Sequence, residues 1–455
     1  MVILNTAKDT VRILDKRALH YSDRPPSYII GERVFDGMHP MFMNANGRWK
    51  LRRKLYHQIL QETVCDSQHI PLVEAESAQL IKDICRVPQD LMLHPGRYSN
   101  SITMALVFGI RTPNYDAPHY LKLRELMTAL SGLGEIGATP PMDIIPIFKL
   151  LPAKLWGNWK DRAAKLKECV WTLYSPIVDK VIARRNGGRN AESFLDGVLD
   201  QQEKLGLTRD EINVMCGNLL EGGTDTMATL ILTCCQAMAL NPNILKEAHA
   251  HIDSVVGDDR MPTWRDYDRL PYVAMIVKEL HRWRPPAPAG FPHVLDQDDE
   301  IGGGVKLPKG TSVIMNIWGL HHDAERYPNP NEFNPRRYEN MTQLSPVYQN
   351  AGDWEKRDHF GYGIGRRICP GIHLAERGLW LGIVRVLWAF DIKQKKDAAG
   401  KLVPIDVDPA TGYTDGFLNQ CLPFQVDIKV RSERRLETVL SEARRAEVDV
   451  FSRFD

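Results

Sequence analysis

The sequence has 455 residues, of which 43% are hydrophobic and 25% are charged, a balance typical of a globular protein. The formal net charge of +1 gives no support to polyanion binding, so no nucleic-acid partner is expected. The eight cysteines are scattered, without the spacing of a zinc site or a disulfide framework, which favours a reducing compartment.

The amino-terminal third is expected to be mostly helical. Residues 1–4 are followed at once by polar residues, so no signal peptide is expected, and no stretch reaches the ~18 apolar residues of a membrane-spanning helix. Residues 6–9 can cap a short helix, and residues 49–60 predict a basic, amphipathic helix. Residues 130–156 mix apolar residues with Pro and Gly, which predicts a mobile apolar surface segment rather than core.

The clearest helix begins at a capping box. Thr208-Arg-Asp-Glu211 has the Ser/Thr-x-x-Glu spacing that satisfies free amides at a helix start. No proline follows until Pro242, after Leu240 and Asn241, so the helix is expected to run to Leu240. About thirty residues at 1.5 Å each give roughly 48 Å, which is long enough to cross a large domain.

The second half is also expected to be helical, with few strands. Residues 271–283 and 370–390 predict helices, whereas residues 304–307 and 311–315 flank a Pro-Lys-Gly turn and predict a hairpin. Helices and strands do not alternate along the chain, and no repeats occur. The predicted fold class is therefore mainly α with small β-sheets, in a single domain over 1–455.

A glycine-rich loop around Cys369 carries the clearest chemical signal. Gly361, Gly363 and Gly365 allow the backbone to lie close to a flat ligand. Cys369 precedes a helix, whose amino-terminal amides favour a thiolate, and such a thiolate can ligate iron. A lone cysteine at a helix start is usually structural. A nucleotide-binding GxGxxG loop is disfavoured, because Arg366 replaces the last glycine and no strand–helix unit with a downstream acid follows.

Taken whole, Tyr362-Gly-Ile-Gly-Arg-Arg-Ile-Cys-Pro-Gly371 resembles the heme-binding signature Phe-x-x-Gly-x-Arg-x-Cys-x-Gly of the cytochrome P450 family. Three further motifs follow the family's order: Gly222-Gly-Thr-Asp-Thr226, Glu279-Leu-His-Arg282 and Phe333-Asn-Pro-Arg-Arg-Tyr338. The resemblance implies the cytochrome P450 fold, with a long central helix over heme b. It also implies Cys369 as the ligand of the heme iron, and an ion-pair cluster that holds the cysteine loop in place.

Asp225 and Thr226 are the residues to which the resemblance assigns catalysis. Two glycines inside a helix cost roughly 1 kcal/mol each relative to alanine, which is explained if something must approach the backbone closely. A kink or a tight helix crossing is the alternative. The resemblance implies that Asp225 and Thr226 form the acid–alcohol pair that relays protons to dioxygen. Met227 stands where the family often has Thr or Ser, but it leaves Thr226 in place.

The resemblance also implies contacts with the heme. Trp49 and Arg53 lie four residues apart on one helix face and match the family's propionate-binding helix. Arg367 matches a second contact of the family, and His293 matches a third more loosely. For His293 the alternative is a hydrogen-bonded loop histidine. Tyr362 keeps an aromatic ring beneath the porphyrin, in place of the family's phenylalanine. The expected cofactor-binding residues are Cys369, Trp49, Arg53, His293, Arg367, Tyr362 and Gly363.

The implied activity is that of a heme-thiolate monooxygenase, which inserts one oxygen atom of O2 into a hydrophobic small molecule. The runs 376–380 and 412–417 resemble fungal specialised-metabolism members, implying a polyketide, terpenoid or aromatic substrate. A heme-thiolate isomerase, dehydratase or peroxide-user, or an inactive heme-binding protein, is the alternative, and the retained acid–alcohol pair argues against it. Candidate pocket walls are residues 35–46, 131–146, 287–291 and 413–417.

The expected electron donor is an NADPH–cytochrome reductase. Lys50 and Lys54 share a helix face next to that of Trp49 and Arg53, and this face is a candidate docking site, with an ordinary solvated face as the alternative. Relative to membrane-bound members, the chain begins tens of residues late. A complete member is therefore expected to have an upstream anchor helix and to lie on the cytosolic face of the endoplasmic reticulum membrane. Membrane association would then depend on residues absent from this chain, which has no transmembrane segment.

Overall fold

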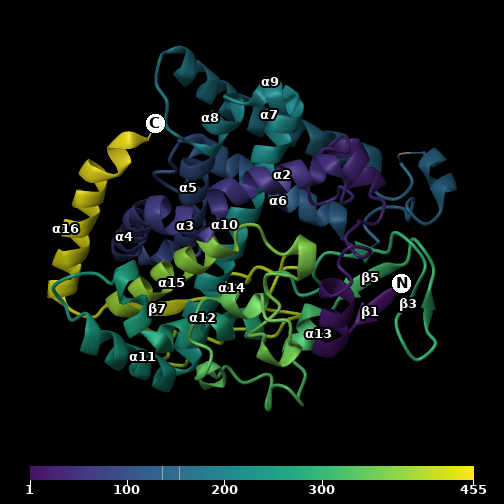
Figure 1. Ribbon diagram of the computed structural model, residues 1–455. Helices are drawn as coiled ribbons and strands as arrows, with labels where there is room; N and C mark the ends of the chain where they lie inside the picture. The colour runs from purple at the N-terminus through teal and green to yellow at the C-terminus, as the bar shows by residue number, and fades with distance from the viewer. Residues whose placement is uncertain (136, 153, 455) are drawn as a thin grey trace.

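The computed structural model describes residues 1–135, 137–152 and 154–454. Helices make up most of the molecule, and the strands form small separate sheets (Figure 1). The α-helices are α1 (Ala7–Thr10), α2 (Gly47–Leu60), α3 (Glu62–Val64), α4 (Ile70–Arg86), α5 (His94–Phe108), α6 (Pro118–Gly134), α7 (Trp159–Asn186), α8 (Phe194–Leu199), α9 (Gln202–Leu205), α10 (Arg209–Leu240), α11 (Pro242–Val255), α12 (Pro271–Trp283), α13 (Ile317–His321), α14 (Ser345–Gln349), α15 (Ile372–Ala389) and α16 (Glu433–Asp449). The strands are β1 (Val2–Leu4), β2 (His293–Val294), β3 (Asp299–Glu300), β4 (Lys306–Leu307), β5 (Ser312–Met315), β6 (Phe390–Gln394) and β7 (Val426–Val430).

The long central helix α10 begins and ends where the sequence predicts. The Glu211 amide donates to Thr208 Oγ1 at 3.2 Å, and the Thr208 amide donates to Glu211 Oε2 at 3.0 Å, which completes the capping box. The helix ends at Leu240, and Pro242 begins α11. The predicted helices over residues 49–60, 271–283 and 370–390 are likewise confirmed to within two residues as α2, α12 and α15.

Strand pairing differs from the predicted hairpin over residues 304–315. β5 forms the centre of a three-stranded sheet, parallel to β1 and antiparallel to β2, while β4 pairs with β3. The tight turn is instead at Gly302, Gly303 and Gly304, which all have positive φ and allow β3 and β4 to fold back on each other. The hairpin prediction is therefore wrong, because both edges of β5 are occupied by strands distant in sequence.

The predicted surface segment over residues 130–156 is correct only in its later part. Leu130 and Leu133 lie in α6 and are buried, as is Met142. Exposed apolar side chains begin at Ile144 and continue to Trp156. Residues 136 and 153 of this segment lie outside the described residues.

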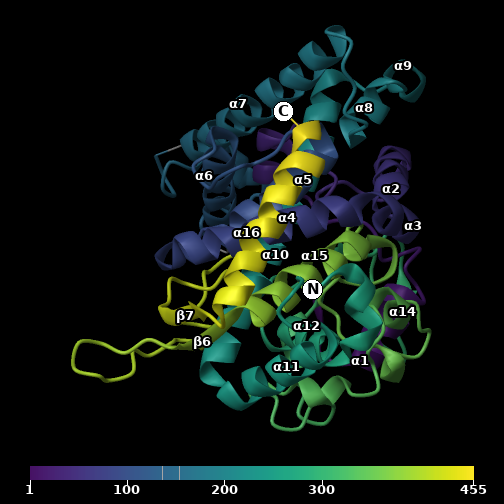
Figure 2. The ribbon, with the colours of Figure 1, turned by 90° about the vertical axis from the view of Figure 1, so that its left-hand side faces the viewer.

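The helix α16 near the carboxyl terminus forms a strap across one side of the molecule (Figure 2). It packs along α4. Arg435, near its start, pairs with Asp253 at 2.7 Å and with Asp258, and Glu447, near its end, accepts from Lys82 at 2.6 Å. Ala75 of α4 packs with Ala446 and the chain beyond it. This helix had not been anticipated from the sequence.

All eight cysteines are free thiols. Among the described residues, no single helix combines the length and the apolar composition needed to cross a bilayer.

Candidate active site

A cavity of about 330 Å³ lies between α10 and the cysteine loop. Its wall contains side chains from α2, α5, α6, α10 and α15, from the loop that follows α12, and from the end of β5 and the start of α13. All of the predicted site residues except Asp225 line it: Trp49, Arg53, Thr226, His293, Tyr362, Gly363, Arg367 and Cys369. Residues distant in sequence thus meet around one space.

The cysteine loop depends on its glycines for shape. Gly363 and Gly365 have φ of +79° and +63°, a conformation that glycine adopts without strain. A Cβ on Gly365 would also lie 2.2 Å from the Leu14 carbonyl oxygen. The Cys369 amide donates to the Tyr362 carbonyl at 2.8 Å, which closes the loop and places the thiol at the cavity.

Two groups favour the thiolate form of Cys369. Burial raises the pKa of this thiol, whereas a hydrogen bond from the Gly371 amide and the positive charge of Arg53 lower it. Gly371 immediately precedes α15, so the favourable amide comes from the amino-terminal end of that helix, as predicted. An iron ion bound at the sulfur would favour the thiolate further.

Three half-buried arginines, Arg24, Arg53 and Arg367, line the cavity near the cysteine. Arg53 donates to the Ile368 carbonyl at 2.7 Å, and Arg367 stacks over the Trp49 ring at 4.2 Å. Burial lowers the pKa of Arg24 to about 10 and that of Arg367 to about 9, with the charge of Arg24 adding to the shift of Arg367. Within the described chain none of the three forms an ion pair with a carboxylate. A ligand with two carboxylates, as in the propionates of heme b, fits this concentration of positive charge.

His293 lines the cavity but is tied to the protein backbone. Its Nδ1 lies 2.6 Å from the Tyr21 carbonyl oxygen, so Nδ1 carries the proton and donates. Burial, with Arg24 and Arg367, lowers the pKa of His293 to about 3. The neutral ring therefore has no second N–H to offer a propionate. A propionate contact at His293 would require the doubly protonated ring.

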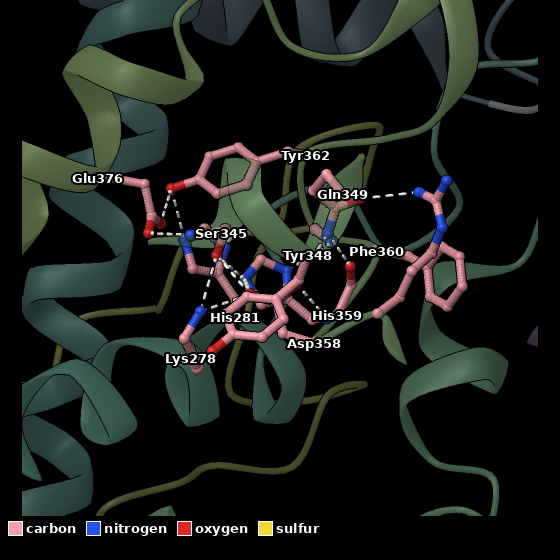
Figure 3. Close-up of polar contacts among 12 residues, drawn as sticks. Lys278, His281, Ser345, Tyr348, Gln349, Asp358, His359, Phe360, Tyr362 and Glu376 are labelled. Carbon is pink, nitrogen blue, oxygen red and sulfur yellow. Dashed lines mark hydrogen bonds and ion pairs between the residues drawn. The ribbon is translucent and has the colours of Figure 1, made fainter. Parts of the chain in front are cut away.

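Tyr362 joins the cysteine loop to a buried polar network (Figure 3). Its hydroxyl donates to Glu376 of α15 at 2.8 Å and accepts from His281 of α12 at 3.1 Å. His281 stacks on His359 with ring centroids 4.5 Å apart. Because phenylalanine could make neither hydrogen bond, the family's usual residue at this position would leave Glu376 and His281 short of a partner.

The ion-pair cluster forms as expected. Glu279 and Arg282 make two hydrogen bonds of 2.7 Å, both side chains are fully buried, and Arg337 lies 3.4 Å from Glu279. Arg282 also donates to the His321 carbonyl at 2.9 Å. The His321 ring in turn accepts from the Phe360 amide at 2.8 Å, two residues before Tyr362 of the cysteine signature. The cluster is thus connected to the cysteine loop through His321.

The two glycines of α10 serve different purposes. A Cβ on Gly223 would lie 2.4 Å from Thr103 Oγ1, so Gly223 allows the close crossing with α5. A Cβ on Gly222 would meet nothing within 4 Å, and Gly222 lines the cavity. Thr226 also faces the cavity and donates to the Gly222 carbonyl at 2.9 Å. The tight helix crossing therefore explains Gly223, whereas close approach of a ligand to Gly222 stays a prediction.

Asp225 lies beside Thr226 in sequence but points elsewhere. Its carboxyl is hydrogen-bonded to Gln420, and among the described residues it does not line the cavity. Burial raises the pKa of Asp225 to about 6, although Gln420 and the charge of Arg124 act in the opposite direction.

Three of the four predicted pocket walls contribute lining residues. These come from residues 35–46, 287–291 and 413–417. The fourth, residues 131–146, contributes none among its described residues, because α6 ends at Gly134 and the cavity meets that helix earlier, at Met127 and Leu130. Residue 136 lies outside the described residues.

Arg24 and Glu221 line the cavity but are not among the residues expected from the sequence, and the pairing of His39, which lies in the predicted wall 35–46, is not expected either. Arg24 joins the cation cluster, and Glu221 forms a buried pair with His39 at 2.8 Å. Arg24 and His39 belong to irregular segments without a helix or strand pattern. Glu221 directly precedes the glycine pair, and its position there was the available signal.

Comparison with known proteins agrees with this geometry. The cytochrome P450 family model matches residues 1–406. The monooxygenase anuE of Penicillium roqueforti is 58% identical over 455 residues, covering 100% of this chain and 92% of the relative. The monooxygenase yanC of Aspergillus niger is 44% identical, covering 97% and 83%, and patH of Aspergillus clavatus is 44% identical, covering 100% and 85%.

A solved structure shows the same fold. A zebrafish cytochrome P450 with progesterone superposes with a TM-score of 0.75 at 22% identity, covering 94% of this chain and 93% of that chain. The predicted mainly α architecture with small sheets is confirmed. The chain therefore belongs to the cytochrome P450 family, as a monooxygenase that uses heme b as its cofactor.

Proposed function

We propose that this enzyme inserts one oxygen atom of O2 into a hydrophobic small molecule of fungal secondary metabolism, a polyketide, a terpenoid or an aromatic compound. The observation that carries the proposal is the cavity, which has Cys369 and the cations on one side and largely apolar side chains around Thr226 on the other. Such a cavity with few polar groups suits a hydrophobic ligand. The sequence runs at residues 376–380 and 412–417 and the fungal relatives support the assignment to secondary metabolism.

Metabolite profiling of a gene-deletion strain tests this proposal. The strain should accumulate a compound with one oxygen atom fewer than the missing product. The purified enzyme should convert that compound under isotopically heavy dioxygen and incorporate one heavy atom. Conversion without incorporation would instead indicate an isomerase or a dehydratase.

Each part of the site has a role under this proposal. Heme b, when bound, supplies the iron at which dioxygen is activated. Cys369 ligates that iron, and the Gly371 amide and Arg53 help to keep its sulfur ionised. Trp49, Arg367 and the neighbouring cations would hold the propionates, and Tyr362 and Gly363 would lie against the porphyrin. The apolar wall excludes water from the reacting atoms.

Thr226 and Asp225 are proposed to deliver protons. Thr226 Oγ1 lies at the cavity and donates to the Gly222 backbone carbonyl, so a rotation about its side-chain bond can present the hydroxyl to a ligand. Asp225 lies on the Gln420 side of α10, and its pKa of about 6 allows it to take up and release protons near neutral pH. Because the two side chains point in different directions, protons from Asp225 would need intervening water to reach Thr226 at the cavity.

Thr226→Ala is expected to uncouple the reaction. Without the hydroxyl, product formed per NADPH consumed should fall by about 10-fold while hydrogen peroxide rises, because proton delivery becomes unselective. The measurement is product, peroxide and NADPH in the same reaction. Thr226→Ser keeps the hydroxyl and should retain most of the coupling. Unchanged coupling in Thr226→Ala would show that protons arrive by another path.

We propose that an NADPH–cytochrome reductase docks on α2. Trp49 of this helix is buried and Arg53 reaches the residue preceding Cys369, so the helix lies beside the cysteine loop. Lys50 and Lys54 are exposed on the same helix. A positive surface beside the iron ligand suits an acidic electron donor.

The double substitution Lys50→Glu and Lys54→Glu tests the docking face. Reductase-supported turnover should fall by about 10-fold at low salt, and the effect should shrink as the Debye length falls from ~10 Å at 0.1 M to ~3 Å at 1 M. Turnover driven by added peroxide should be unchanged. Reversal of Lys395 and Lys396 is the control, because both are exposed directly after β6, a strand that lies far from α2 in Figure 2. Equal losses in both double variants would contradict the proposed face.

We further propose that the enzyme works at the cytosolic face of the endoplasmic reticulum membrane. The exposed side chains of Ile144, Ile147, Leu150 and Trp156, between α6 and α7, support a contact of this surface with lipid. Fractionation of cells that express the complete gene product tests this location.

A further inference from the structure

A buried carboxylate lies in the cavity wall of α10. Glu221 is 3% exposed, and it is the only carboxylate among the described residues that line the cavity. The cations that line the same cavity are grouped at the propionate end and are directed to backbone carbonyls. Burying an ionised carboxylate away from water is unfavourable in free energy unless hydrogen-bond donors surround it.

Two neutral donors hold Glu221 in position. Tyr174 of α7 donates its hydroxyl to Glu221 Oε1, and His39 Nε2 lies 2.8 Å from Glu221 Oε2. The Met41 amide donates to His39 Nδ1 at 3.2 Å, so Nδ1 has no proton and Nε2 carries the hydrogen. Neither partner cancels the negative charge of the carboxylate.

The surrounding residues are arranged to support this trio. A Cβ on Gly217, one turn before Glu221, would lie 2.3 Å from the Tyr174 ring, so glycine allows that ring to lie against α10. The His39 ring packs between Phe35 and Phe42, with centroids at 4.4 and 5.3 Å. Three separate segments thus fix the orientation of one carboxylate.

The carboxylate has acceptor capacity left for a ligand. Two carboxylate oxygens can accept about four hydrogen bonds, and the described residues supply two. Lining residues of the same cavity include Phe42, Leu106 and Leu219, and Gly222, the next residue along α10, adds no side chain to fill it. We propose that Glu221, positioned by His39 and Tyr174, accepts a hydrogen bond from a hydroxyl group of the substrate and so orients it over the heme. This inference rests on the proposed monooxygenase function and adds the substrate class, an uncharged hydrophobic molecule bearing a hydroxyl.

The same charge predicts which molecules are rejected. A methyl ether of the substrate cannot donate a hydrogen bond and would leave the carboxylate desolvated. A carboxylic acid, ionised at neutral pH, would be repelled by Glu221.

Binding to the ferric, heme-loaded enzyme tests the proposal without requiring turnover. Naphthol, methoxynaphthalene and naphthoic acid are aromatic probes that differ in this one group, and each is titrated while the Soret band is followed. Naphthol should bind ~10-fold or more tightly than methoxynaphthalene, as expected for a hydrogen bond to a charged acceptor. Naphthoic acid should bind least. Equal binding of naphthol and its ether would overturn the proposal.

Variants then assign the preference to Glu221. Glu221→Gln should reduce the naphthol preference to below about 3-fold and relieve the exclusion of the acid. Glu221→Asp keeps the charge but withdraws the carboxylate, and it provides the same test if the Gln variant lacks a heme-thiolate spectrum. Asn218→Ala, one turn away in the cavity wall, is the control and should keep the preference. If Glu221→Gln kept the preference for naphthol and Asn218→Ala lost it, the assignment to Glu221 would be overturned.

These outcomes are separate from the proposed reaction. If naphthol preference depends on Glu221 but no compound incorporates oxygen, the proposed function fails while the recognition site stands. If Glu221→Gln changes only peroxide release and leaves the binding ratio intact, Glu221 serves proton transfer and the recognition proposal is wrong.

Discussion

Cys369→Ser is expected to abolish the red-shifted Soret band of the reduced carbon monoxide complex and to stop product formation. A serine hydroxyl is not ionised in this site and cannot replace the thiolate that increases electron density at the iron. Activity should fall by at least ~10³-fold, which corresponds to about 4 kcal/mol in the activation barrier. Difference spectra and product assays on the same preparation measure both effects.

Cys85→Ser and Cys169→Ser are the matched controls for this prediction. Both thiols are partly buried, as Cys369 is, but neither lines the cavity among the described residues. Each variant should keep the band and the activity. Retention of the band in Cys369→Ser, with its loss in another cysteine variant, would mean that the iron ligand is a different residue.

Arg282→Ala should lower the free energy of unfolding more than any other substitution proposed above. The substitution leaves the fully buried Glu279 without its main partner and removes donors from the carbonyls of His321, Pro330 and Glu332. Breaking a buried ion pair in this way costs about 3–5 kcal/mol. Because His321 links the cluster to Phe360, heme retention should fall as well. Thermal unfolding and heme content of the purified protein are the measurements.

Arg336→Ala is the corresponding control on the surface. Arg336 pairs with Glu247 and Glu339, but its side chain is 49% exposed, so solvent screens these pairs and they contribute little to stability. Comparable destabilisation by the two substitutions would show that burial of the Glu279 pair is unimportant.

Features encoded by neighbouring residues could be predicted from the sequence. The capping box at Thr208, the helix termini at Pro242 and Pro271 and the glycines before Cys369 all depend on contacts within a few residues. The resemblance to known motifs then brought Trp49 and Cys369 to one site, which no local pattern could have done.

Features that depend on tertiary contacts could not be predicted. β5 pairs with β1, some 310 residues earlier. The residues around the turn before β5 carry no pattern that would reveal this distant partner. Asp225 and Thr226 are adjacent, yet on a helix adjacent side chains point about 100° apart, so one faces the cavity and the other Gln420. His39 reaches Glu221 across 182 positions, and only the folded chain shows that the two form a pair.

The strap formed by α16 has a genetic consequence. Because Arg435 and Glu447 tie this helix to Asp258 and Lys82, a stop codon at the start of α16 would strip a buried face of α4 and remove these partners of Asp258 and Lys82. Truncating alleles late in the reading frame would therefore behave as loss-of-function alleles rather than as silent ones. An expression clone trimmed to residues 1–406, the stretch that the family model matches, would carry the same defect.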